Sequence, residues 1–285
     1  MATKTHPRKP FFRRKRKNLS PEELSQRADR NRNRINKMKR GIFILPSLLT
    51  LGGIFLGFYS MVSAIEQQFV LAAALILIAG VFDGVDGKVA RLTHTATRFG
   101  LELDSLADVI SFGVAPAMLI YLWALPDAGR IGWVSAFVFV ACGALRLARF
   151  NVQSGSIDPE RFNGLPIPAA AAMAATTVLF FDKIGIPPRD HVTLLLITNF
   201  VLAFFMVSTV KFHAFKNLTM VKQKPFSSTV AFVLFLALVA ASPSIVPFLL
   251  CFSYVTSGPI LTLVLYLRKR KAVEEPRPAQ ADALM

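Results

Sequence analysis

Cysteine and acidic residues are both scarce in this chain. Its 2 cysteines, Cys142 and Cys251, each lie inside an apolar stretch, away from any second cysteine or histidine at metal-ligand spacing. This excludes the zinc and iron–sulfur sites that need closely spaced thiolates. Asp and Glu together number 17 against 33 Lys and Arg, so the formal net charge is +16.

Apolar residues, in contrast, are abundant. Hydrophobic residues make up 53% of the 285, the chain contains 25 Phe, and the mean hydropathy is +0.49. An ordinary soluble domain is much less apolar than this. We therefore expect most of the chain to lie in a lipid bilayer.

The positive charge is concentrated at the N-terminus. Residues 1–41 contain fifteen Lys or Arg and three acids, which accounts for +12 of the +16. Basic segments beside a membrane are attracted to anionic lipid headgroups by about 1 kcal/mol per residue. We therefore predict that this arm meets the lipid surface rather than nucleic acid. It lacks the apolar core and small-residue cleavage site of a signal peptide, so we expect it to be retained.

Eight apolar segments approach the length of about 20 residues that crosses roughly 30 Å of hydrocarbon. They are residues 42–62, 67–84, 99–123, 131–148, 165–181, 191–210, 227–242 and 245–267. Basic residues gather in the loops after the even-numbered segments, so the positive-inside rule places both termini in the cytoplasm. The predicted fold is an all-α, polytopic membrane helical bundle of about eight transmembrane helices. The weakest break is Ser242-Pro243-Ser244, and one kinked helix there would make seven spans.

The distribution of charged and apolar residues divides the chain into three regions. Residues 1–41 form a basic cytoplasmic arm that is disordered or interfacial, residues 42–267 form the membrane domain, and residues 268–285 form a cytoplasmic tail.

Four acids lie where the second membrane segment ends and the third begins. Asp83 and Asp86 are three residues apart, and Asp104 and Asp108 are four apart, so each pair shares one helix face. Their mutual repulsion would be severe, because even one ionisable residue at the membrane centre costs about 2.5 to 3.5 kcal/mol. A cation would relieve it, and oxygen ligands favour Mg²⁺ or Mn²⁺. Two such ions about 3.5 to 4 Å apart could clamp a pyrophosphate.

Small residues and an arginine accompany these acids. Gly87 and Ala90 share a helix face with the first pair and Gly100 with the second, which lets a nucleotide or another helix come close. Arg91, one turn beyond Gly87, offers a planar fork for phosphate. The alternative is that the acids face water and pair with Lys88, Arg91 and Arg98. That alternative would explain any single acid well. It explains poorly why four acids and three small residues occur in this order.

The order of these residues is also informative. The pattern Asp-x2-Asp-Gly-x2-Ala-Arg-x8-Gly-x3-Asp-x3-Asp, which begins at Asp83, resembles the signature of the CDP-alcohol phosphotransferase family at every fixed position. The resemblance implies an all-helical membrane enzyme that exchanges the CMP of a CDP-lipid for an alcohol. It implies that metal is held by Asp83, Asp86, Asp104 and Asp108. It also implies that Asp108 accepts the proton of the attacking hydroxyl and that the CDP moiety contacts Gly87, Arg91 and Thr97.

Four further stretches are similar to those of membrane-integral phosphatidylserine synthases. They are residues 46–59, 104–116, 142–151 and 162–168. The resemblance implies CDP-diacylglycerol and L-serine as substrates, a homodimer, and a bacterial cytoplasmic membrane with the active site facing the cytoplasm. Within the first stretch we expect Thr50 to contact the CDP-lipid.

A zwitterionic acceptor such as serine needs a cation for its carboxylate and an oxygen for its ammonium group. Arg146 or Arg149 could supply the first, and Asn151 or Asn163 part of the second. Both arginines could equally be ordinary membrane anchors on the cytoplasmic side.

Two groups of alternatives remain. The same chemistry could use glycerol 3-phosphate, inositol phosphate or choline, although the two phosphorylated acceptors call for a denser basic pocket. A cation transporter also carries acids within the membrane, but transporters usually show inverted repeats and broken helices near the midplane.

Overall fold

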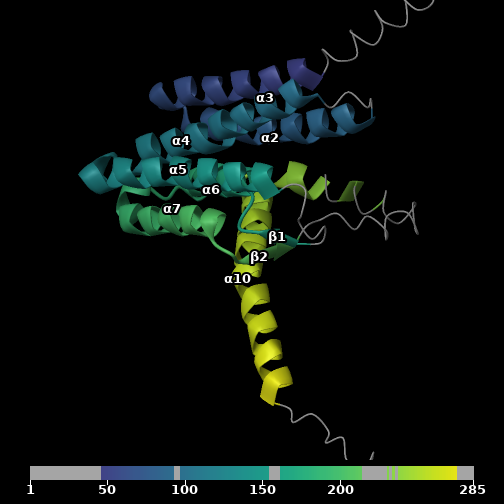
Figure 1. Ribbon diagram of the computed structural model, residues 1–285. Helices are drawn as coiled ribbons and strands as arrows, with labels where there is room; N and C mark the ends of the chain where they lie inside the picture. The colour runs from purple at the N-terminus through teal and green to yellow at the C-terminus, as the bar shows by residue number, and fades with distance from the viewer. Residues whose placement is uncertain are drawn as a thin grey trace, which may run out of the picture. The chain divides into compact units, whose positions relative to one another are not determined.

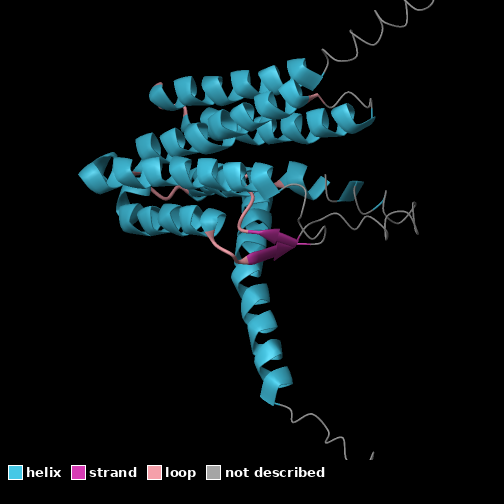
Figure 2. Cartoon of the chain, viewed as in Figure 1, coloured by secondary structure: helices cyan, strands magenta, loops and turns pink. Residues whose placement is uncertain are grey.

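The structure is a computed structural model that describes residues 46–92, 97–153, 161–213, 230, 233–234 and 237–274. Almost all of these residues are helical (Figure 2). Within them, seven helices are long and apolar enough to cross a membrane, which confirms the all-α, polytopic class. These helices span Pro46–Ile65, Phe69–Val89, Arg98–Ala124, Pro126–Val152, Ile167–Ile184, Pro188–Val207 and Ile245–Val264.

Figure 1 labels the elements that follow the Pro46–Ile65 helix. The long helices are α2 (Phe69–Leu92), α3 (Arg98–Asp108), α4 (Ala115–Ala124), α5 (Gly129–Gln153), α6 (Ile167–Ile184), α7 (Val192–Val207) and α10 (Ile245–Glu274). A π-helical turn, η1 (Val109–Val114), joins α3 to α4, so that these three elements make one span. Two short 3-10 turns, η2 (Pro126–Ala128) and η3 (Pro188–His191), precede α5 and α7.

The predicted span at residues 227–242 is described only in part, at residues 230, 233–234 and 237–242. Residues 237–241 are helical, and a turn at Pro243 and Ser244 separates them from α10, so the chain does break at Ser242-Pro243-Ser244. Helix α10 then continues to Glu274, beyond the boundary predicted for the tail.

Helix α6 packs against α2, α4 and α10. Its buried face is rich in alanine, including Ala170, Ala171, Ala174 and Ala175. Small side chains let helices approach closely, and van der Waals contact of this kind drives helix association in lipid. The Gly185 backbone, in the left-handed conformation at φ +69°, ends α6.

Helices α5 and α7 pack side by side and share a buried polar contact. Asn199 Nδ2 donates to the Ser135 carbonyl oxygen at 3.0 Å and to Ser135 Oγ at 2.7 Å. The contact satisfies an amide that would be costly to leave unpaired in an apolar interior.

A two-stranded antiparallel sheet links the chain after α5 with the chain after α7 (Figure 2). Strand β1 (Arg161–Asn163) pairs with β2 (Lys211–His213). Phe212 is fully buried against α10, where a Cβ on Gly258 would overlap its ring. The Lys211 amide donates to Thr262 Oγ1 of α10 at 3.0 Å, so β2 holds α10 through both a side chain and the backbone.

Large apolar side chains are exposed on the outside of several helices. Phe55, Val81 and Phe137 are each more than 60% exposed. Such a surface suits hydrocarbon rather than water, in agreement with a membrane protein.

Candidate active site

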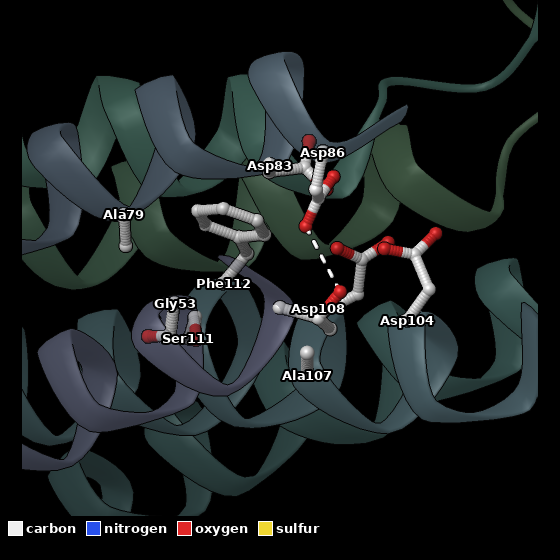
Figure 3. Close-up of a pocket in the computed structure, with 10 residues that line it drawn as sticks. Gly53, Ala79, Asp83, Asp86, Asp104, Ala107, Asp108, Ser111 and Phe112 are labelled. Atoms are coloured by element: carbon white, nitrogen blue, oxygen red, sulfur yellow. Dashed lines mark hydrogen bonds between the residues drawn. The ribbon is translucent and has the colours of Figure 1, made fainter. Parts of the chain in front are cut away.

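A cleft lies between the Pro46–Ile65 helix, α2 and the segment formed by α3 and η1. All four predicted metal-binding acids line it (Figure 3). The full lining is Thr50, Gly53, Ala79, Asp83, Asp86, Asp104, Ala107, Asp108, Ser111 and Phe112.

Three of the acids meet in one group. Asp83 of α2 and Asp104 and Asp108 of α3 each place a carboxylate oxygen within 4.8 Å of the others, and all three are half-buried. Figure 3 shows the aspartates of α2 facing those of α3. The four-residue spacing of Asp104 and Asp108 puts both on the same side of α3, which turns them together toward α2.

The donor set and spacing of this group fit a hard divalent cation. Every ligand is a carboxylate oxygen, as Mg²⁺ and Mn²⁺ prefer. Oxygens on opposite sides of a Mg²⁺ ion lie about 4.2 Å apart, since each bond is about 2.1 Å long. Oxygens at adjacent positions lie only about 3 Å apart, so the three carboxylate oxygens, which lie within 4.8 Å of one another, would move inward to bind one ion.

Asp86 is placed differently from the other three acids. It is 5% exposed, and its Oδ2 accepts a hydrogen bond from Thr50 Oγ1 of the Pro46–Ile65 helix at 3.1 Å. The structure thus divides the four acids into a group of three and one neighbour that is bound to another helix.

The water-facing alternative required these acids to pair with nearby basic side chains. The ion pair found among the described side chains lies elsewhere: it joins Arg189 Nε of η3 to Asp127 Oδ2 of η2 at 3.7 Å. Lys88 and Arg98 form no such pair with the cleft acids, and the Arg91 side chain lies outside the description. The described geometry therefore favours an added cation over pairing with Lys88 or Arg98.

The residues predicted to contact CDP are spread around the cleft. Thr50 lines it. Thr97 and Gly100 lie at the start of α3, where the Gly100 amide donates to Thr97 Oγ1 at 3.0 Å and caps the helix. Gly87 is half-buried on α2, one turn beyond Asp83. The backbones of Ala90 and Arg91 continue α2, but their side chains are outside the description.

Three of the four residues predicted to bind the acceptor have described side chains, and these three have different neighbours. Arg146 of α5 lies close enough to Asp108 and to Tyr254 of α10 to interact electrostatically with both. Its Nε atom is buried and has no hydrogen-bond partner in the described part of the chain. A buried polar atom of this kind calls for an explanation.

Arg149 and Asn151 contact other residues of the described chain. Arg149 Nη1 lies 3.5 Å from the Val207 carbonyl oxygen at the end of α7. Asn151 Nδ2 donates to Ser105 Oγ of α3 at 2.9 Å. Asn163 lies on β1, and its side chain is not described.

Several residues of the cleft were not among the predicted site residues. They are Gly53, Ala79, Ala107, Ser111 and Phe112, and none has chemistry that marks it as a ligand. All except Ala79 fall within the stretches 46–59 and 104–116 that the sequence resemblance covers. Tyr254 carried no signal at all, because it lies more than a hundred residues from Arg146 and only packing brings them together.

Comparison with known proteins agrees with this geometry. A family model described as CDP-alcohol phosphatidyltransferase matches residues 43–210. A Helicobacter pylori protein named CDP-diacylglycerol–serine O-phosphatidyltransferase is 43% identical over 176 residues, which cover 62% of this chain and 74% of the relative.

Two more distant relatives extend the comparison. A Mycobacterium bovis protein of the same name is 42% identical over 133 residues, or 45% of this chain and 46% of its own. A Methanothermobacter thermautotrophicus protein named archaetidylserine synthase is 42% identical over 156 residues, or 53% of this chain and 66% of its own. With the family match covering more than half of its length, the chain belongs to the CDP-alcohol phosphatidyltransferase family.

Proposed function

We propose that this protein transfers the phosphatidyl group of CDP-diacylglycerol to the hydroxyl of L-serine, giving phosphatidylserine and CMP. The observation that carries the proposal is the meeting of Asp83, Asp104 and Asp108 in one cleft of a chain from this family. The choice of serine is supported by the names of the relatives that share 42–43% identity.

The reaction is a single displacement at the lipid-linked phosphorus. The serine oxygen forms a new bond to this phosphorus, and the bond from the same phosphorus to the bridging oxygen of the pyrophosphate breaks. CMP leaves with that electron pair. Asp108 takes the proton of the serine hydroxyl, which makes it the general base, a role that typically contributes 10² to 10⁴ in rate.

The four acids of the cleft, Asp108 included, would hold the metal that binds the pyrophosphate. Asp83, Asp86, Asp104 and Asp108 would hold divalent metal, Mg²⁺ or Mn²⁺, and their number suits two ions. When bound, such ions supply charge stabilisation at the entering and leaving oxygens. The chain's part is to fix the carboxylates on two neighbouring helices and to orient the pyrophosphate between them.

The nucleotide end of the substrate lies toward the start of α3 and the end of α2. Gly87, Ala90 and Gly100 allow the CDP moiety to approach the backbone, and Thr97 and Arg91 contact it. Thr50 completes this set from the Pro46–Ile65 helix, beside Asp86.

Arg146 binds the carboxylate of serine. Its buried, unpartnered Nε and its proximity to Asp108 support this role, because the acceptor must reach both the base and a cation. Asn151 and Asn163 help to receive the ammonium group. Arg149, which reaches the Val207 carbonyl oxygen, has a lesser part.

The charge distribution supports the proposed orientation of the enzyme, and the resemblance to membrane-integral phosphatidylserine synthases is the basis for the proposed membrane and homodimer. Both termini and the active site face the cytoplasm of a bacterial cell, and the protein lies in its cytoplasmic membrane as a homodimer. The arm at residues 1–41, with +12 of formal charge, contacts anionic headgroups.

A parallel acceptor assay tests the proposed function. The purified full chain in detergent receives CDP-diacylglycerol with serine, glycerol 3-phosphate, inositol phosphate or choline, and released CMP is measured. We expect release with serine to exceed release with the other acceptors. A stronger response to another acceptor would overturn the choice of serine, and no CMP release with any acceptor would favour the transporter alternative.

Removal of metal tests the role of the carboxylates. We expect EDTA to abolish CMP release and an excess of Mg²⁺ or Mn²⁺ to restore it. Full activity in EDTA, with the metal content of the protein confirmed to be zero, would contradict the metal-binding role of the four acids.

A further inference from the structure

One face of the Pro46–Ile65 helix contacts α2 and the π-helical turn η1, which continues α3. Thr50, Gly53 and Gly57 are spaced three and four residues apart, so they lie on the same side of the helix. Thr50 and Gly53 line the cleft itself. This face contributes no carboxylate. It contacts Asp86 of α2 at one point and Ser111 of η1 at two others.

The first contact is with α2. The Thr50 hydroxyl lies 3.1 Å from Asp86 Oδ2 and 3.0 Å from the Pro46 carbonyl oxygen, so its one proton is shared between two acceptors. Thr50 is 7% exposed and Asp86 is 5% exposed, which shields the bond from competing water. A carboxylate oxygen has more than one lone pair, so Asp86 keeps capacity for a further ligand.

The second and third contacts are with the π-helical turn η1, which begins directly after Asp108. Ser111 Oγ donates to the Gly53 carbonyl oxygen at 3.0 Å, in a buried position. A Cβ added to Gly57 would lie 2.7 Å from Ser111 Oγ and 2.8 Å from Ser111 Cα. The two backbones are therefore so close that no side chain larger than hydrogen fits at position 57.

We propose that Thr50, Gly53 and Gly57 form a positioning face that sets the carboxylates of α2 and α3 at their working separation. Through Thr50 the face orients Asp86, and through Ser111 it holds the turn that follows Asp108. Single π-helical turns are frequent at functional sites, where they change the direction of neighbouring side chains. The inference rests on the proposed function, because the separation matters for metal and pyrophosphate.

The expected size of the effect follows from the chemistry. Groups that orient metal ligands through hydrogen bonds typically alter metal affinity by 10- to 100-fold. A displacement of about 1 Å in a reacting group can lower the rate by about 10²-fold. These residues are positioning residues, since none of them touches the reacting atoms in the proposed mechanism.

The test uses two pairs of variants and measures Mn²⁺ binding to the purified full chain by electron paramagnetic resonance, without substrate. Thr50→Val removes the hydroxyl at almost constant volume, and Thr50→Ser keeps it. We expect Thr50→Val to raise the Mn²⁺ dissociation constant about 10-fold and Thr50→Ser to stay within about 3-fold of the native protein. Unchanged Mn²⁺ affinity in Thr50→Val would overturn the role of Thr50.

The second pair compares glycines in two helices. Gly57→Ala forces the Pro46–Ile65 helix away from η1, whereas a Cβ at Gly84, an exposed position of α2, meets nothing within 4 Å. We expect Gly57→Ala to lower kcat about 10- to 100-fold and to weaken Mn²⁺ binding, while Gly84→Ala stays within about 2-fold. A folded Gly57→Ala protein with native Mn²⁺ affinity and native kcat would overturn the positioning role of this contact.

Two further results separate the possible failures. Should Gly57→Ala not fold, as judged by gel filtration in detergent, the Thr50 pair decides the matter alone. Mn²⁺ binding is measured without substrate, so it does not depend on turnover. If the native protein released no CMP while the variants still weakened Mn²⁺ binding, the proposed function would be refuted and the positioning face would stand.

Discussion

The two polar regions of this protein differ in how their residues come together. In the cleft, Asp83, Asp104 and Asp108 lie on two consecutive helices and converge within 4.8 Å. At the end of α5, Arg146, Arg149 and Asn151 lie within six residues of one another, yet each has a different neighbour. Closeness in sequence therefore produced one shared site in the first region and three separate environments in the second.

Helix geometry explains this difference. Spacings of three and four residues place the acids of each pair on one face, and α3 begins at Arg98, soon after α2 ends at Leu92. The residues of α5 are spaced three and two apart, so Asn151 turns toward Ser105 of α3 while Arg149 reaches α7. Arg146 lies near Tyr254 of α10, a residue near the end of the chain. We infer that the placement of the catalytic acids depends on two helices that are neighbours in sequence. The choice of acceptor depends on packing between helices that are far apart in sequence.

The largest expected effect concerns the cleft. Asp108→Asn keeps the size of the side chain but removes its ability to take a proton, so we expect kcat to fall about 10²- to 10⁴-fold. Asp190→Asn, an exposed acid in η3, is the matched control and should leave CMP release unchanged. Near-native turnover by a folded Asp108→Asn protein would show that the base lies elsewhere.

An intermediate effect should separate Arg146 from Arg149. A hydrogen bond to a charged group contributes roughly 1.5 to 3 kcal/mol, so Arg146→Gln should raise KM for serine about 10- to 100-fold. KM for CDP-diacylglycerol should not change. Arg149→Gln, whose guanidinium is bound to a carbonyl oxygen, should change KM for serine less than about 3-fold.

The use of serinamide makes this comparison sharper. Serinamide lacks the carboxylate, so the native enzyme should prefer serine over it, and Arg146→Gln should lose most of that preference. Equal losses with both acceptors would mean that Arg146 only compensates the charge of Asp108 and does not select serine.

The smallest effect should come from the contact between α5 and α3. Asn151→Ala removes the hydrogen bond to Ser105, which is partly exposed, so we expect kcat/KM for serine to fall about 2- to 5-fold. Ser105→Ala removes the same bond but leaves Asn151 able to receive the ammonium group of serine, so it should have a smaller effect. The double variant should be no worse than Asn151→Ala, because the bond is already gone. Equal losses in the two single variants would show that Asn151 does not receive the ammonium group and acts only by joining α5 to α3.

Part of the fold was predictable because the bilayer imposes simple rules. Apolar runs of suitable length predicted the seven membrane-spanning segments to within five residues at each end. Helices α2 and α10 continue beyond these segments, to Leu92 and Glu274. The π-helical turn after Asp108 was not predicted, since its sequence, Val109 to Val114, has no proline, and a glycine such as Gly113 is common in membrane helices. Nor was the small sheet of β1 and β2, which depends on the packing of Phe212 against Gly258.

The amino-acid sequence by itself determined the membrane class and the pairing of the four acids, because hydrophobic length and helical periodicity act within single segments. The tertiary structure alone decided which acid bonds to Thr50, how closely Gly57 approaches Ser111, and that Tyr254 reaches Arg146. These contacts join residues between 36 and 108 positions apart, and the chain brings such residues together only when complete helices pack.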